Sequence, residues 1–150
     1  MRAALPLFLA ALLVAGCDSS DDQLDADFYL GTWTLVSVSD EGGDRTAEVL
    51  ALLDDFGASF RSDGSFRLDV DLNDQVNAAG QADAEIEGNY QATEDALVLL
   101  VETLALSFDA EADGSDRVDL TAPGLVISQI LGAGLQIEFD GRVTLGIRRQ

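Results

Sequence analysis

Alternation of apolar and polar residues is the feature that most constrains the fold of this chain. Between Gln81 and Ala92 small or apolar residues occupy every second position, and polar residues fill the positions between them. Successive side chains of a strand point to opposite faces, so this period of two predicts a β-strand with one buried face. The strands predicted in this way are 31–38, 58–61, 65–72, 81–92, 96–101, 104–110, 117–121, 135–140 and 142–148.

Turn residues separate these segments at short intervals. Asp63-Gly64 lies between two alternating runs, which is a strong signal for a β-hairpin. Asp140-Gly141 predicts a closing hairpin between the last two strands, and residues 73–80 are expected to form a loop.

Two segments depart from the period of two. In Thr46–Phe56, the apolar residues Val49, Leu52, Leu53 and Phe56 recur at the spacing of one helix face, so we predict a helix. Thr46 is its expected N-cap and Gly57 its expected stop. Residues 123–134 are apolar and glycine-bounded, and they predict a short helix or a covering loop.

Eight or nine short strands joined mostly by tight turns predict an up-and-down meander. An open meander has two free edges, and closure into a barrel removes both. The expected fold is therefore all-β with one or two short helices: an up-and-down antiparallel β-barrel over residues 29–150, in one domain.

The residues of this domain resemble a known family. Gly31-Thr32-Trp33 resembles the Gly-x-Trp signature of the lipocalins, and the stretches GTWTLVSV, FRSDGSF, GNYQATEDALVLL and FDGRVTLGIRR are similar to bacterial lipocalin-like domains. The resemblance implies that Trp33 closes one barrel end and that Arg148 or Arg149 packs over its ring. The predicted helix 46–56 departs from the lipocalin order, in which a helix lies near the end of the chain.

The first sixteen residues read as a secretory signal. Arg2 precedes a run of about a dozen apolar residues, which is shorter than the roughly twenty that a membrane-spanning helix needs. The tetrad from Val14 to Cys17, VAGC, resembles the bacterial lipobox, which implies cleavage between Gly16 and Cys17 and acylation of Cys17. The alternatives are an ordinary secretory signal with an unrelated cysteine, or a buried free thiol.

Residues 17–28 are acidic and too poor in apolar side chains to fold alone, so we expect a flexible tether. The lipobox implies a cell-envelope protein held on a membrane by lipid, with the outer membrane favoured over the inner. Acidic residues behind the cysteine resemble the export tag of certain surface lipoproteins, whereas Asp18 matches a retention signal for the inner membrane. These rules conflict and leave the membrane leaflet open.

Composition excludes several functions. The chain has 28 acidic residues, 8 arginines, no lysine, no histidine and one cysteine, for a net charge of −20. Histidine-dependent catalysis, histidine-bound zinc and an internal disulfide are excluded, and nucleic acid is an improbable partner for such a surface. We expect no enzyme activity and no cofactor.

Two functions follow from the barrel itself. Ala84, Gly88 and Tyr90 share the apolar face of one strand and could line a pocket for a small apolar ligand. The alternative is that these residues pack against the segments 46–56 and 123–134 and leave no cavity. The domain would then be a structural or interaction module that presents an acidic face to an unidentified protein partner.

Acidic clusters offer two weaker hypotheses. Asp109, Asp113 and Asp116, with Gly114 at the sixth position, resemble the start of a calcium loop, but the twelfth position is Leu120. A solvated acidic turn is the favoured interpretation. Catalysis by paired carboxylates, Glu85 with Glu87 or Asp69 with Asp71, is disfavoured because these pairs lie on the exposed strand faces.

Overall fold

The computed structural model describes residues 24–131, 135 and 137–150. The strands in this part of the chain are β1 (Gly31–Asp40), β2 (Gly43–Asp44), β3 (Leu53–Phe60), β4 (Ser65–Leu72), β5 (Ala84–Ala92), β6 (Ala96–Val101), β7 (Leu104–Ala112), β8 (Arg117–Pro123) and β9 (Arg142–Arg149). The helices are all short: α1 (Ala26–Tyr29), α2 (Thr46–Leu50), α3 (Asp74–Ala78) and α4 (Gly124–Ile130).

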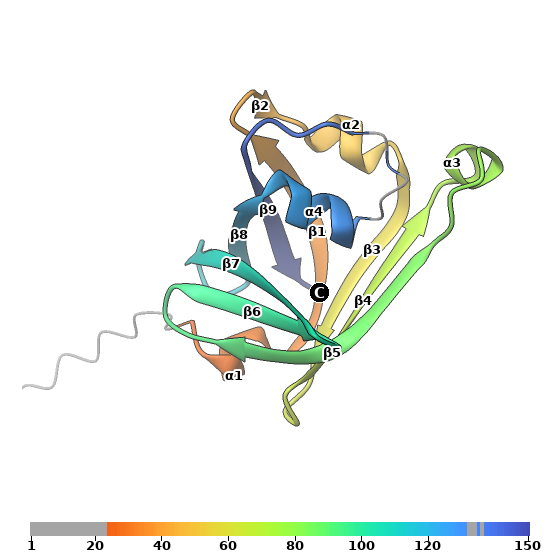
Figure 1. Ribbon diagram of the computed structural model, residues 1–150. Coiled ribbons are helices and arrows are strands. Elements are labelled where there is room, and N and C mark those ends of the chain that lie inside the picture. Colours follow the sequence, from red (N-terminus) through yellow and green to blue (C-terminus); the bar gives the residue numbers. More distant parts are fainter. Residues whose placement is uncertain (1–23, 132–134, 136) are drawn as a thin grey trace, which may run out of the picture.

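Strands β1 and β3 to β9 form a closed antiparallel barrel of eight strands (Figure 1). Each strand pairs with its neighbour in the chain order, and β9 closes the ring by pairing with β1. The two-residue strand β2 extends the end of β1 as a small hairpin. The predicted all-β, up-and-down, lipocalin-like barrel is therefore confirmed.

The barrel core follows the predicted alternation. In β4 the buried residues Phe66, Leu68, Val70 and Leu72 alternate with more exposed polar residues. The predicted hairpin at Asp63-Gly64 joins β3 to β4, and Gly64 has a φ of +82°, a conformation that favours glycine. The buried core of the described part of the chain consists of hydrophobic residues.

The helix predicted over 46–56 is too long. The observed helix α2 ends at Leu50, and the chain re-enters the sheet at Leu53, so Gly57 lies inside β3 and does not stop the helix. From Phe56 onward a period of two outweighs the helical spacing, since Phe56, Ala58 and Phe60 all face the core and pair with β4. The predicted N-cap is also wrong, because Thr46 is the first residue of the helix and Arg45 takes the cap position. The Thr46 hydroxyl hydrogen-bonds the backbone N–H and carbonyl oxygen of Val38.

Three other boundaries also differ from the predictions. Residues 137–140 form no strand, so β9 pairs with β8 and β1 and the predicted closing hairpin is wrong. Helix α3 lies in the predicted loop 73–80, where the Asn73 side chain caps its first turn. The end of the predicted tether is folded, since Leu24 is buried and α1 begins at Ala26. The predicted helical segment after Pro123 is confirmed by α4.

Candidate functional site: the barrel interior and its two ends

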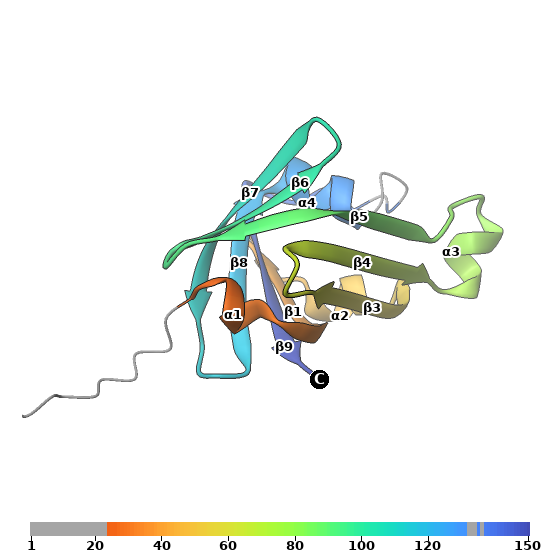
Figure 2. The ribbon, with the colours of Figure 1, turned by 90° about the horizontal axis from the view of Figure 1, so that it is seen from below.

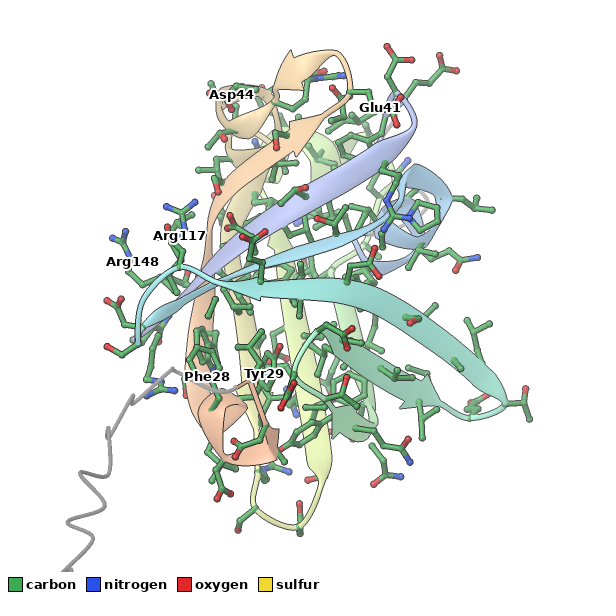
Figure 3. All side chains as sticks on the ribbon, turned by 90° about the vertical axis from the view of Figure 1, so that its left-hand side faces the viewer. Phe28, Tyr29, Glu41, Asp44, Arg117 and Arg148 are labelled. Carbon is green, nitrogen blue, oxygen red and sulfur yellow. The ribbon has the colours of Figure 1, made fainter. Side chains whose placement is uncertain are left out.

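An aromatic cluster closes the barrel end at which β1 begins. Trp33 is fully buried, and its indole Nε1 donates a 2.6 Å hydrogen bond to the carbonyl oxygen of Tyr29. The rings of Phe28 and Tyr29, both labelled in Figure 3, lie 5.6 and 6.3 Å from the Trp33 ring. Gly31, with φ of +113°, makes the turn from α1 into β1. Helix α1 therefore covers this end.

Arg149 completes the same cluster. Its guanidinium carbon lies 4.9 Å from the Trp33 ring centroid and 5.6 Å from that of Phe28, within the range of cation–π attraction. The guanidinium also donates to the carbonyl oxygen of Phe28. Arg148 lies on the outer side of β9, opposite Arg117 of β8 (Figure 3). Of the two arginines that the lipocalin resemblance implies, Arg149 takes the position over the tryptophan.

The interior between the two ends is filled by side chains. The apolar cavity inside the barrel measures about 20 Å³, which is room for about one water molecule. Pockets that hold small molecules are typically about 300–1,000 Å³. Ile127 and Ile130 of α4 are buried, and Figure 1 shows this helix inside the curve of the sheet. The cavity is lined by Phe56, Ala58, Phe60, Leu68, Leu97, Leu99, Phe108, Leu120, Ile130, Leu145 and Ile147.

Gly88, one of the predicted pocket residues, does not create space. A Cβ atom at this position would lie 2.1 Å from the Leu100 carbonyl oxygen and 2.9 Å from the Phe66 ring. The missing side chain therefore allows β5, β6 and Phe66 to approach one another closely. Ala84 is half-buried at the start of β5, paired with Val70 of β4.

Tyr90, the third predicted pocket residue, contributes to the packed core instead of lining a pocket. Its hydroxyl lies 3.2 Å from the carbonyl oxygens of Ala26 and Arg61, so it connects α1 to the end of β3. Its ring meets Phe60 edge-on, with centroids 5.0 Å apart. Burial raises the pKa of the Tyr90 hydroxyl, and the nearby Asp27 and Asp63 carboxylates raise it further. Tyr90 therefore stays a neutral hydrogen-bond donor.

Tyr29 differs from Tyr90 in having no partner. Its hydroxyl is buried and makes no hydrogen bond to the residues that the structure describes, and burial raises the pKa of this group well above its ordinary value. An unpaired buried hydroxyl lowers the stability of a fold. Sequence reasoning missed this group, because the strand pattern begins only after it.

The predicted calcium residues do not converge on one point. Asp109 lies within β7 and pairs with Arg142, whereas Asp113 begins the β7–β8 turn, with its carboxylate 3.3 Å from the Arg117 guanidinium. Asp116 ends that turn, directly before β8. Within the described ranges, no group of three acidic, histidine or cysteine side chains could hold a metal ion.

Three of the four carboxylates considered for catalysis surround an arginine. The Arg67 guanidinium lies 2.9 Å from Asp69, 2.7 Å from Glu85 and 3.5 Å from Glu87. These carboxylates are exposed on the outer face of β4 and β5, where solvent weakens each pair. The arrangement neutralises part of a crowded acidic surface and leaves no carboxyl group in an apolar setting.

Asp40 holds the opposite barrel end together. Its buried carboxylate accepts hydrogen bonds from the backbone N–H groups of Asp140 and Gly42, at 3.1 and 2.9 Å, and from Arg45 at 2.9 Å. The Asp140 N–H is the main cause of the lowered pKa of Asp40, followed by Gly42 and Arg45. The Asp-x-Gly-Gly sequence is a turn signal, but the contact with Asp140 is 100 residues distant in the chain.

These features define the class of protein as an all-β, lipocalin-like barrel with a packed interior. No protein-family model matches the chain. No curated protein matches it either. None of the helices in the described part of the chain is long and apolar enough to span a membrane. The predicted lipidation residue Cys17 and cleavage residue Gly16 lie outside the described residues.

Proposed function

We propose that this protein is a non-catalytic, lipid-anchored protein of the bacterial cell envelope, whose barrel acts through its outer surface as an interaction module. The observation that carries the proposal is the packed interior, where about 20 Å³ is free. A carrier of small apolar molecules needs a cavity more than tenfold larger. The outer surface, with most of the net charge of −20, is therefore the part that can meet a partner.

The lipid anchor is proposed from the sequence VAGC at 14–17. Cys17 is the sole cysteine of the chain and directly follows an apolar leader and two small residues. Two or three acyl chains on this residue would hold the protein stably, whereas one chain would bind only marginally.

The anchor would orient the barrel on the membrane. The described fold begins at Leu24, and the seven residues from Cys17 span at most about 25 Å. The α1 end would then stay near the membrane, and the end with α2 and α4 would face away from it. The exposed large apolar residues of the described chain, Leu50, Leu104 and Leu125, belong to α2, the start of β7 and α4 at that far end.

Membrane fractionation of cells that make the Cys17→Ser variant tests the anchor. We expect the wild-type protein in the membrane fraction and the variant in the soluble fraction, because the thiol that carries the lipid is gone. Ser19→Ala, two residues further on, is the matched control and should stay with the membrane. Membrane association of Cys17→Ser equal to that of wild type would contradict the anchor.

Native mass spectrometry of protein purified from its own envelope tests the packed interior. We expect the mass of the acylated chain with no small molecule bound in a one-to-one ratio. An apolar small molecule bound in a one-to-one ratio would overturn the interaction module and favour a carrier function. In such a carrier α4 would have to move out of the barrel. This outcome leaves the anchor untouched, so the two parts of the proposal fail separately.

A further inference from the structure

Strand β7 carries an edge that the barrel leaves partly unpaired. Its pairing with β8 ends at Asp109 and Thr121, whereas its pairing with β6 continues to Leu104. After Thr121, the next residue of β8 whose backbone groups face β7 is Pro123. Proline has no N–H to donate, and the chain then enters α4. Within the described ranges, residues 104–108 therefore pair with β6 alone.

The direction of the backbone groups shows which atoms are free. The Ala110 N–H donates to the Asp95 carbonyl oxygen on the β6 side. Backbone groups alternate along a strand, so the N–H and C=O of Ala105 point away from β6, toward the open edge. Ala105 is exposed, and so is Leu125 of α4, which is two residues past Pro123 and 73% exposed. Helix α4 therefore leaves this edge open.

This edge lacks the protection that proteins usually give to edge strands. Residues 104–108 read LALSF, with no charge and no proline. Another incompletely paired stretch is residues 84–88 of β5, which pair with β4 but not with β6. That stretch presents Glu85 and Glu87 on its outer face, where charge opposes the addition of another strand. Residues 35–38 of β1 are also uncharged and pair with β9 but not with β3, yet Thr46 and Arg45 hydrogen-bond the backbone of Val38 at their end. Among these stretches, the edge of β7 combines an uncharged sequence with no such cover in the described residues.

An acidic hollow adjoins the open edge. It lies on the outer face of β7, β8 and β9, measures about 450 Å³, and includes Asp109, the last β7 residue that pairs with β8. Four carboxylates line the hollow, and among the described arginines Arg142 contacts Asp109 and Arg117 lies 3.4 Å from Asp119. An excess of negative charge remains. The lining residues are Asp95, Asp109, Ala110, Glu111, Asp119, Thr121 and Thr144.

We propose that the open edge of β7 receives an extended segment of a partner protein as an added strand, with Lys or Arg residues at the end of the segment that lies beside β8. Backbone bonds to Ala105 supply the pairing, and the acidic hollow selects the basic end of the segment. The inference rests on the proposed role as an interaction module, but not on the lipid anchor.

A second copy of this chain fits the edge less well. Two copies carry −20 each and repel one another. Five residues of paired edge also bury far less than the roughly 1,200 Å² of a stable interface. A basic segment is attracted by the acidic surface beside the edge, whereas a second acidic copy is repelled by it. Charge therefore favours the basic segment over the second copy.

Amide hydrogen exchange of the full chain in detergent micelles, with and without the synthetic peptide RRTVTVT, tests the proposal. Threonine and valine favour an extended strand, and the two arginines reach the hollow if the peptide runs antiparallel to β7. We expect the Ala105 N–H to exchange rapidly in the free protein and at least tenfold more slowly with millimolar peptide. The peptide EETVTVT should protect it at least fivefold less, and RRTPPPT, whose three central residues have no N–H in either register, should not protect it.

Protein variants make the test independent of the peptide alone. Ala105→Pro removes the edge N–H at a position where a strand tolerates proline, and it should abolish binding of RRTVTVT. Glu87→Pro, at the edge of β5, is the matched control and should bind the peptide like wild type. Glu111→Gln in the hollow should weaken binding about twofold to fivefold.

Three results would overturn the proposal: no protection of Ala105 by RRTVTVT, equal protection by RRTPPPT, or protection in the free protein together with a dimer in sedimentation equilibrium. The last result would assign the edge to a second copy. None of them touches the wider interaction module, which fails only if a passenger molecule is found inside the barrel.

Discussion

Two tyrosines show how much one hydroxyl can differ from another within the same core. Tyr90 uses its hydroxyl to connect α1 with the end of β3, whereas the Tyr29 hydroxyl is buried without a partner. The alternation of strand β5 correctly placed Tyr90 on the buried face. It could not show the bonding partner, because the carbonyl oxygen of Ala26 is 64 residues away in the chain.

Removing the two hydroxyls should have opposite effects. We expect Tyr29→Phe to raise the free energy of unfolding by about 1 kcal/mol, since it removes an unpaired buried polar group. Tyr90→Phe should lower it by about 1 kcal/mol through loss of a hydrogen bond. Urea unfolding followed by tryptophan fluorescence measures both, with Trp33 as the probe. A loss of stability in Tyr29→Phe would mean that its hydroxyl has a partner in solution.

Glycines in strands also need the structure for their interpretation. Gly88 permits close approach, since a Cβ would collide with a backbone carbonyl, whereas a Cβ at Gly57 of β3 would meet nothing within 4 Å. In the sequence, Gly88 lies within an alternating run and Gly57 is the expected stop of a helix, and neither context shows what a Cβ atom would meet. The sequence suggested a cavity at Gly88, but the neighbouring strand fills that space.

Alanine substitution distinguishes these two glycines. We expect Gly88→Ala to lower the free energy of unfolding by about 2–4 kcal/mol, because the backbone of β5 or β6 must shift. Gly57→Ala should be neutral or stabilise by about 0.5 kcal/mol through the unfolded state. Thermal unfolding by circular dichroism compares the two variants. Equal melting temperatures would refute the close packing at Gly88.

At the scale of elements, period and burial decided which segments could be predicted. The strands with clean alternation, β4 and β5, lie close to where the sequence places them. The segment 46–56 fits a helical spacing by coincidence, and pairing of Phe56–Phe60 with β4 overrides that local preference. Residues 137–140 have strand-forming side chains but cannot pair with β9 as predicted, because β1 and β8 already flank β9.

Helix α4 is the element that makes the interior solid, and its two faces should respond differently to mutation. Ile127 is fully buried, so Ile127→Ala should cost about 2–4 kcal/mol of unfolding free energy. Leu125 on the same helix is 73% exposed, and Leu125→Ala should change stability by less than about 0.5 kcal/mol. Denaturant unfolding measures this difference. Similar, small effects at both positions would show that α4 is not docked in the barrel.

Asp40 joins the β1–β2 turn, α2 and the loop before β9. We therefore expect the stability of the protein to fall at acid pH. The pKa of Asp40 is lowered in the fold, so Asp40 stabilises the protein above its ordinary pKa of about 4 and loses this effect as pH falls through the folded value. Asp40→Asn should unfold at a lower temperature than wild type at pH 7. The difference should shrink as pH falls below about 4. A pH-independent difference would exclude the charge as its cause.

At the scale of the whole molecule, charge dominates. Like charges face each other even within the sheet, since Asp55 of β3 lies directly opposite Asp71 of β4 (Figure 2 shows the two strands side by side). Such pairs destabilise a sheet, and a net charge of −20 repels itself at longer range. The closed barrel tolerates this repulsion because its packed apolar core offsets it.

Salt should therefore stabilise this protein. Raising NaCl from 10 to 500 mM shortens the Debye length from about 30 Å to less than 5 Å, which screens the carboxylates from one another. We expect the melting temperature to rise by at least about 3 °C, close to 1 kcal/mol for a domain of this size. Asp71→Asn removes one member of the facing pair, so it should raise the melting temperature at low salt and reduce its dependence on salt. A melting temperature that falls with added NaCl would mean that the ion pairs of Arg45 and Arg67 outweigh the repulsion, and that the acidic surface is arranged for stability instead of for a partner.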